Sequence, residues 1–246
     1  MSAPAEADRS IVGAGTTEAE WAGWAGWSSP ARSVAELVPS RLVVIAPHPD
    51  DETLMAGGLM HDAVRAGLPV LVIAVTQGDA SHPGSARWPV PVLRAQRRFE
   101  RARALASLGA RDVLELGVGD GLVQRECAAV AGMIRTALQP ADTVVTTWRF
   151  DGHPDHEATA AAACAARPDR LLEAPVWGWH WARPDQLPAD AIRYPLAAAT
   201  RAAKVRAIAA FGSQLEADPS TGADPILPDW ALPRWQRPCE VYFNAC

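Results

Sequence analysis

The feature that most constrains the fold is an alternation of short apolar runs, rich in β-branched residues, with longer helix-like stretches. Four of the runs predict strands, at 41–46, 69–76, 112–116 and 142–147. Four stretches that follow them predict helices, at 52–66, 92–108, 122–138 and 155–166. Strands that alternate with helices favour a mainly parallel sheet covered on both faces. We therefore expect a doubly wound α/β fold.

The alternation predicts one Rossmann-like domain over residues 16–246, with residues 1–15 as a flexible N-terminal tail. Thr17-x-x-Glu20 resembles a capping box, which predicts a helix that carries Trp21, Trp24 and Trp27. We expect these indoles to pack on the domain, with a binding surface for a sugar or a partner as the alternative.

The later part of the chain has a looser pattern. Residues 171–181 and 192–196 predict further strands, residues 198–212 predict a helix, and the Pro-rich last thirty residues are expected to wrap the surface. Trp177, Trp179 and Trp181 alternate around His180. The alternation indicates a strand with one face in the core, or an aromatic pocket wall in which His180 meets a polar group of the substrate.

Composition excludes several classes of protein. The 246 residues are 49% hydrophobic and carry a net charge of −5, which predicts a sizeable core and argues against nucleic acid as the main partner. Neither a secretory signal nor an apolar run long enough for a membrane span is visible, so we expect a cytoplasmic protein. The four cysteines have no C-x-x-C spacing and are expected to be reduced.

Two clusters of histidine and aspartate each follow a predicted strand. The first is APHPDDE at 46–52, and the second is DGHPDHE at 151–157. A single Asp-Asp pair usually caps a helix, and a single His-Pro-Asp usually forms a turn. The carboxyl ends of neighbouring parallel strands meet at one edge of a sheet, where ligands bind. Two such clusters at that edge therefore predict a metal site.

The residue types indicate a role for each member of the clusters. His48, Asp51 and His156 supply two imidazoles and a carboxylate, a set that suits Zn²⁺ and also Fe²⁺. Asp50 lies next to Asp51 and points elsewhere, so we assign Asp51 as ligand and Asp50 as general base. Chemistry alone would allow the two roles to be exchanged.

Two further members of the second cluster complete the predicted chemistry. His153 lies three residues before His156 and can stabilise the oxyanion of a tetrahedral intermediate. Asp155 can orient His153 and fix its protonation state.

The two motifs resemble those of the PIG-L/LmbE-like family of zinc-dependent de-N-acetylases, which are N-acetylglucosaminyl deacetylase-like enzymes. The resemblance implies that His48, Asp51 and His156 bind zinc, that Asp50 is the base and that His153 acts electrostatically. It is supported by weaker matches over residues 40–215.

The resemblance also implies residues that bind the substrate. Arg97 in Arg97-x-x-Glu100 matches a helix arginine that meets the substrate, and Asp120 matches an aspartate that binds sugar hydroxyls. Some sugar deacetylases of the family carry a tyrosine two residues before the position of His153. This chain has Asp151 there, and we expect it to face the substrate.

The leading hypothesis is a zinc hydrolase that removes an N-acetyl group from an amino sugar or glycoconjugate, with metal-activated water as nucleophile. The alternatives are an amidase of the same family with another acyl group or a non-sugar amide, an Fe²⁺ oxygenase, and a binding module without catalysis. A small molecule is the expected partner, while the exact substrate, the metal in the cell and the oligomeric state stay open.

Overall fold

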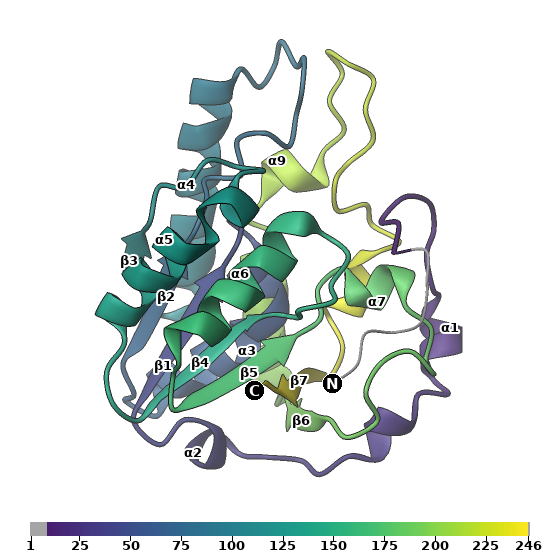
Figure 1. Ribbon diagram of the computed structural model, residues 1–246. Helices are drawn as coiled ribbons and strands as arrows, with labels where there is room; N and C mark the ends of the chain where they lie inside the picture. Colours follow the sequence, from purple (N-terminus) through teal and green to yellow (C-terminus); the bar gives the residue numbers. More distant parts are fainter. Residues whose placement is uncertain (1–8, 246) are drawn as a thin grey trace.

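A computed structural model describes residues 9–245 of the chain. Seven strands form one sheet in the order β3-β2-β1-β4-β5-β7-β6 (Figure 1). The five strands from β3 to β5 are parallel, whereas β7 is antiparallel to both β5 and β6. The strands are β1 (Arg41–Ala46), β2 (Val70–Ala74), β3 (Asp112–Glu115), β4 (Asp142–Thr147), β5 (Arg170–Ala174), β6 (Ile192–Pro195) and β7 (Cys239–Asn244).

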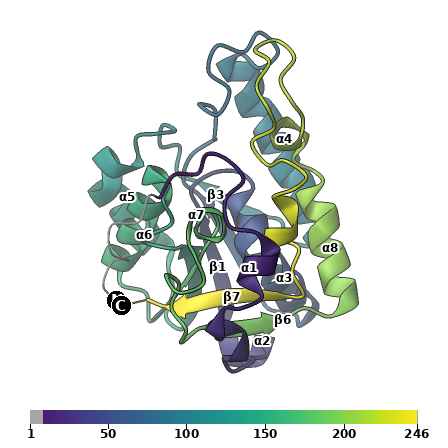
Figure 2. The same ribbon diagram turned by 90° about the vertical axis from the view of Figure 1, so that its right-hand side faces the viewer.

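Helices cover both faces of this sheet. Figure 2 shows α5 and α6 on one side and α4 and α8 on the other. The longer helices are α3 (Asp51–Arg65), α4 (Val90–Leu108), α5 (Val123–Ala137), α6 (Pro154–Ala166) and α8 (Ala198–Ile208). The short helices are α1 (Glu18–Trp21), α2 (Val34–Leu37), α7 (Gly178–Trp181) and α9 (Gly212–Leu215), with 3-10 turns η1 (Ala25–Ser28) and η2 (Leu232–Arg234).

The apolar strand residues divide between two cores. Val43 and Ile45 of β1 point toward α5 and α6, whereas Leu42 and Val44 point toward α3, α4 and α8. All four are fully buried. Burial on both faces explains why β1 is an apolar run without a polar alternation. The expected doubly wound, mainly parallel sheet is thus confirmed.

The winding direction changes between β1 and β4. From β1 the chain runs outward to β2 and β3, and then returns to β4 on the other side and continues to β5. The carboxyl ends of β1 and β4 therefore border a crevice at the switch point, which is where ligands bind in open α/β sheets.

Two of the expected elements differ from the structure. Residues 171–181 do not form one strand: β5 ends at Ala174, and Gly178–Trp181 is the helical turn α7. The chain turns there because the backbone N–H groups of Val176 and Gly178 donate to the buried Asp151 carboxylate. The Pro-rich C-terminal part also contains β7, where we expected only a surface wrap.

The tryptophan stretch is shorter than expected but packs as expected. Only Glu18–Trp21 is α-helical, and Trp21 and Trp24 are buried against Trp179 with edge-on ring contacts. Arg237 lies over the Trp179 ring at 4.1 Å. These two indoles therefore pack on the domain as expected and do not form the alternative open surface for a sugar or a partner.

Part of the expected N-terminal tail contacts the domain. The Ala14 carbonyl accepts a hydrogen bond from Arg234 at 2.6 Å, and Arg9 pairs with Glu157. Residues 1–8 lie outside the described part of the chain. No helix between residues 9 and 245 is long and apolar enough to cross a membrane.

The cysteines differ from the expectation at one position. Cys164 is disulfide-bonded, while Cys127 and Cys239 are free thiols. The expectation of four reduced cysteines is therefore wrong for Cys164. The absence of C-x-x-C spacing argues only against pairs that are close in sequence.

Candidate metal centre and substrate cavity

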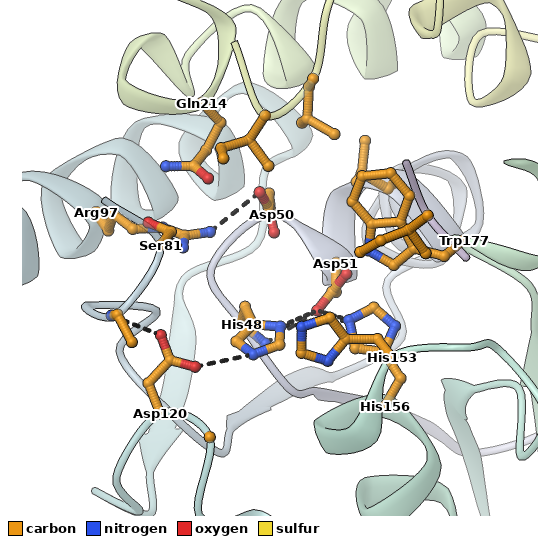
Figure 3. A pocket seen from close by; sticks show the side chains of 16 residues that line it. His48, Asp50, Asp51, Ser81, Arg97, Asp120, His153, His156, Trp177 and Gln214 are labelled. Atoms are coloured by element: carbon orange, nitrogen blue, oxygen red, sulfur yellow. Dashed lines mark hydrogen bonds and ion pairs between the residues drawn. The ribbon is translucent and has the colours of Figure 1, made fainter. Parts of the chain in front are cut away.

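The first cluster lies in the turn between β1 and α3. Apolar β1 ends at Ala46, and α3 begins at Asp51, so His48 and Asp50 project from the carboxyl edge of the sheet. Asp50 has φ +137°, a backbone conformation that is costly for a residue with a side chain. This turn lets the side chains of Asp50 and Asp51 point in different directions (Figure 3).

The second cluster follows β4, where His156 lies in the first turn of α6. Its Nδ1 is 2.7 Å from Asp151 Oδ2. Asp151 is fully buried, and its carboxylate also accepts backbone N–H bonds from Val176, Trp177 and Gly178 at 2.8–2.9 Å. Its oxygens therefore hold His156 and the start of α7 rather than facing the cavity. The expected contact of Asp151 with substrate does not fit this position.

Three donor atoms from the two clusters form a compact triangle. Asp51 Oδ2 is 3.2 Å from His48 Nδ1 and 3.2 Å from His156 Nε2, and the two nitrogens are 3.3 Å apart. Ligand atoms about 2.0–2.2 Å from a tetrahedral ion lie roughly 3.3–3.6 Å from one another. The triangle therefore fits one divalent cation such as Zn²⁺, which His48, Asp51 and His156 would hold.

The other ring nitrogen of His48 meets two carboxylates. Its Nε2 is 3.2 Å from Asp120 Oδ1 and 3.4 Å from Asp155 Oδ2, and Asp155 also accepts the Gly121 N–H at 2.7 Å. Carboxylates in this position orient a metal-binding histidine and raise its basicity. Asp155 thus orients His48, whereas we expected it to orient His153.

Other sets of donors are also close. His48, His153 and His156 offer nitrogens within 4.8 Å of one another. A His48 nitrogen and carboxylate oxygens of Asp120 and Asp155 form a second set within the same distance. We favour the triangle that contains Asp51, because its edges match one ion and because it leaves Asp120 and Asp155 to fix the His48 ring.

Asp50 faces an arginine instead of the histidines. Arg97 donates to Asp50 Oδ2 at 3.1 Å and to the carbonyls of Pro49 and Gly78 at 2.7 and 2.8 Å. Burial raises the pKa of Asp50 to about 7, although the Arg97 cation acts in the opposite direction. Burial would also raise the pKa of Asp51, but the adjacent His156 and His48 lower it instead. The pKa of Asp50 is therefore raised while the pKa of its neighbour Asp51 is lowered, so Asp50 binds a proton more readily than Asp51.

His153 contributes a neutral ring at the cavity wall. Burial, together with the positive charge that His156 and His48 can carry, lowers the pKa of His153 to about 3. Its Nδ1 accepts the backbone N–H of Asp155 at 3.2 Å, so the neutral ring carries its proton on Nε2. His153 can therefore donate one hydrogen bond.

A cavity of about 330 Å³ opens over these groups. His48, Asp50, Asp51, His153 and His156 line it, as do the expected substrate residues Arg97 and Asp120. Trp177 also lines the cavity, in agreement with the alternative of an aromatic pocket wall (Figure 3). Ser81 and Gln214 line it too, and the sequence analysis assigns neither of them to the site. The polar run 77–91 marks Ser81 only as part of a loop, and the position of Gln214 depends on the docking of α9.

His180 does not line this cavity. It is 2% exposed and lies in the wall of a neighbouring cavity, so the expected contact with the amino sugar is not supported by its position. The difference arises because residues 178–181 are helical, which turns His180 away from the crevice.

The fold and the site together define an α/β protein with two histidines and one carboxylate at the sheet edge, a set of donors that can hold a divalent metal. The family model of PIG-L, described as GlcNAc-PI de-N-acetylase, matches residues 43–167. This match covers half of the chain, and the chain belongs to the PIG-L family.

Individual relatives agree with this assignment. A 1D-myo-inositol 2-acetamido-2-deoxy-alpha-D-glucopyranoside deacetylase of Mycobacterium sp. (strain KMS) is 32% identical over 173 residues, 59% of this chain and 56% of that protein. The chain spans about half the length of the curated relatives it matches.

Solved structures show the same fold. The A40926 pseudoaglycone deacetylase has a TM-score of 0.59 and 26% identity, over 72% of this chain and 83% of the other. The N,N'-diacetylchitobiose deacetylase from Pyrococcus horikoshii has a TM-score of 0.64 and 16% identity, over 87% of each chain.

Proposed function

We propose that this protein is a divalent-metal-dependent hydrolase that removes the N-acetyl group from an amino sugar or a glycoconjugate. One observation carries the proposal. His48, Asp51 and His156 form a triangle of donor atoms, and the separate carboxylate of Asp50 lines the same cavity. Membership of the PIG-L family and the deacetylase names of its relatives support it.

The same three residues would hold the ion, and Zn²⁺ suits their nitrogen and oxygen donors. When bound, such an ion supplies a Lewis acid for the amide carbonyl and lowers the pKa of water. The protein must then supply a base, a proton for the leaving amine and a donor for the developing oxyanion.

Asp50 is the residue that we propose moves the proton. Its carboxylate lines the cavity, and a pKa of about 7 suits a group that accepts a proton and returns it at neutral pH. Arg97 holds the carboxylate in place through a 3.1 Å ion pair. Protonated Asp50 then donates to the amine nitrogen as the C–N bond breaks.

His153 and the polar wall complete the proposed site. His153 Nε2–H can donate to the oxyanion, because its Nδ1 is already engaged by the Asp155 N–H. Asp120 accepts the Ala80 N–H at 2.7 Å and contacts His48, yet each carboxylate oxygen has a second lone pair that can accept a sugar hydroxyl. The Gln214 amide lies across the cavity and offers both a donor and an acceptor (Figure 3).

The central test replaces Asp50 with Asn. Acetate release from N-acetylglucosamine derivatives should fall by about 10²–10⁴-fold, because the amide cannot accept the proton. Bound zinc, measured by elemental analysis, should stay at the wild-type level since Asp51 is intact. The matched control is Asp112→Asn, the same change at an exposed position on the opposite end of the sheet, which should keep full activity.

Several results would contradict the proposal. An Asp50→Asn protein with a near wild-type rate would refute the base assignment. A preference for longer acyl groups in a panel of N-acyl glucosamines would favour the amidase alternative. Bound iron with oxygen consumption would favour an oxygenase, and stoichiometric binding without turnover in zinc-loaded protein would favour a binding module.

A further inference from the structure

A second cavity adjoins the candidate site. Its volume is about 390 Å³, compared with about 330 Å³ for the first. Ile11, Trp177 and Ile226 line both cavities, so the two spaces share a wall. The two cavities are therefore adjacent, and a ligand that occupied both would contact Trp177.

The second cavity has a preformed aromatic and apolar surface. Trp230 is 53% exposed, although most large apolar side chains of this protein are buried. Its ring is held by Arg234, whose guanidinium lies 5.1 Å from the ring centroid, and by the His180 ring at 6.0 Å. An exposed but fixed indole is a surface on which an aromatic or apolar ring stacks with little loss of conformational freedom.

The charge of this cavity argues against an anionic ligand. Among its described lining residues, Asp224 is the one with a formal charge at neutral pH, and that charge is negative. Burial and the neighbouring Arg234 cation lower the pKa of His180, so its ring is neutral there. A carboxylate or phosphate in this cavity would lose water without gaining a cation among the lining residues.

We propose that the second cavity binds an uncharged, apolar, ring-bearing aglycone attached to the amino sugar whose acetamide occupies the first cavity. This inference rests on the proposed function and specifies the class of substrate. Trp230 acts as a specificity-determining residue that contacts the aglycone and has no part in the reaction at the amide.

The first experiment compares three substrates on the zinc-loaded protein. These are phenyl N-acetylglucosaminide, unsubstituted N-acetylglucosamine and N-acetylglucosaminyl malate. The phenyl glycoside should have the highest kcat/KM, by about 10-fold or more over N-acetylglucosamine, as expected when one apolar group is buried. The malate derivative should gain nothing over N-acetylglucosamine.

The second experiment tests the contribution of Trp230. In Trp230→Ala the advantage of the phenyl glycoside should be lost, while kcat/KM for N-acetylglucosamine stays unchanged. Phe99→Ala is the matched control, because Phe99 is 58% exposed on α4 and lines neither cavity. It should leave the advantage intact.

Calorimetric binding to the Asp50→Asn protein separates this inference from the proposed function. Phenyl N-acetylglucosaminide should bind this protein more weakly once Trp230 is also replaced by Ala. If binding depends on Trp230 but the wild-type protein releases no acetate, the inference about the second cavity is supported and the proposed deacetylase function is refuted. Equal binding with and without Trp230, or a preference for the malate derivative, would overturn the inference.

Discussion

Asp50 and Asp51 show how strongly local geometry separates two identical side chains. The sequence alone leaves their roles exchangeable, because both follow the same strand and precede the same helix. In the structure Asp51 Oδ2 lies 3.2 Å from nitrogens of both His48 and His156, whereas Asp50 pairs with Arg97 at 3.1 Å. The positive φ of Asp50 produces this divergence, and no sequence pattern specifies it.

The Asp50–Arg97 pair leads to a pH prediction. Arg97 lowers the pKa of Asp50, which burial raises to about 7. Because the base must be unprotonated, activity is lost as the pH falls through this value. In Arg97→Gln the pKa of Asp50 rises further, so the acid limb of kcat/KM should move to higher pH. Arg94→Gln, an exposed arginine on the same helix, serves as control and should leave the profile unchanged.

The measurement is a kcat/KM profile from acidic to alkaline pH for the three proteins. An Arg97→Gln protein with a raised KM and an unmoved acid limb would show that Arg97 contacts only the substrate, as the family resemblance implies. Thermal unfolding of each protein checks that the buried substitution leaves the fold intact.

At the scale of secondary structure, the sequence predicts those helices and strands that form because of the residues within them. β4 has the predicted bounds of 142–147, and the long helices end within a few residues of their predicted ends. The sequence analysis missed α7 and β7 because both depend on residues that are distant in the sequence. Asp151 accepts a hydrogen bond from the backbone just before α7, and β7 pairs with β5 on one side and β6 on the other. The same reason applies to the site, where the motifs predict the ligands but not the Asp120–His48 contact.

Helix α3, which begins at Asp51, depends on a buried ion pair from two other elements. The helix is kinked at Ala56. Lys204 of α8 donates to the Leu54 carbonyl at 2.8 Å, while Glu240 of β7 accepts the N–H groups of Gly58 and Leu59 at 2.7 and 2.9 Å. The Lys204–Glu240 pair thus satisfies backbone groups that flank the kink.

Removal of one partner from this pair should be costly. Lys204→Met leaves the Glu240 carboxylate buried without its cation, which should lower the free energy of unfolding by about 3–5 kcal/mol. Urea denaturation measures this change. Arg206→Met on the exposed face of α8 is the control and should change it by no more than about 0.5 kcal/mol. A loss below about 1 kcal/mol in Lys204→Met would contradict a supporting role for the pair.

At the scale of the whole molecule, the donor triangle connects two halves of the sheet. His48 and Asp51 follow β1, which continues into β2 and β3, whereas His156 follows β4, which continues into β5. An ion bound by all three ties these two windings together. Ligand binding of this kind stabilises the native state by mass action.

Metal removal should therefore lower the melting temperature. At an ion concentration of about 100 Kd the stabilisation is about 2.7 kcal/mol, and for a chain of this size that corresponds to roughly 5–10 °C. Scanning calorimetry with and without a chelator measures the difference. The difference in melting temperature should disappear in His156→Gln. It should remain in the control His61→Gln, because His61 contacts the Leu108 carbonyl and is not one of the three donors.

The same measurement has a pH dependence. Burial lowers the pKa of His156, but the Asp51 and Asp151 carboxylates outweigh burial and raise it to about 9 in the metal-free protein. The ion must displace this proton, so the increment in melting temperature should be larger at mildly alkaline pH than at mildly acidic pH. An increment that is independent of pH would contradict His156 as a ligand.

The origin of the cavity walls has a consequence for the history of this protein. His48, Asp51 and His156 lie within residues 43–167, the part shared with the family, whereas Trp177 and Ile226 come from later in the chain. Substitutions of Trp177 and Ile226 leave the proposed metal ligands and the proposed base Asp50 in place. Proteins that descend from a common ancestor with this architecture can therefore come to bind different substrates while they keep the same reaction.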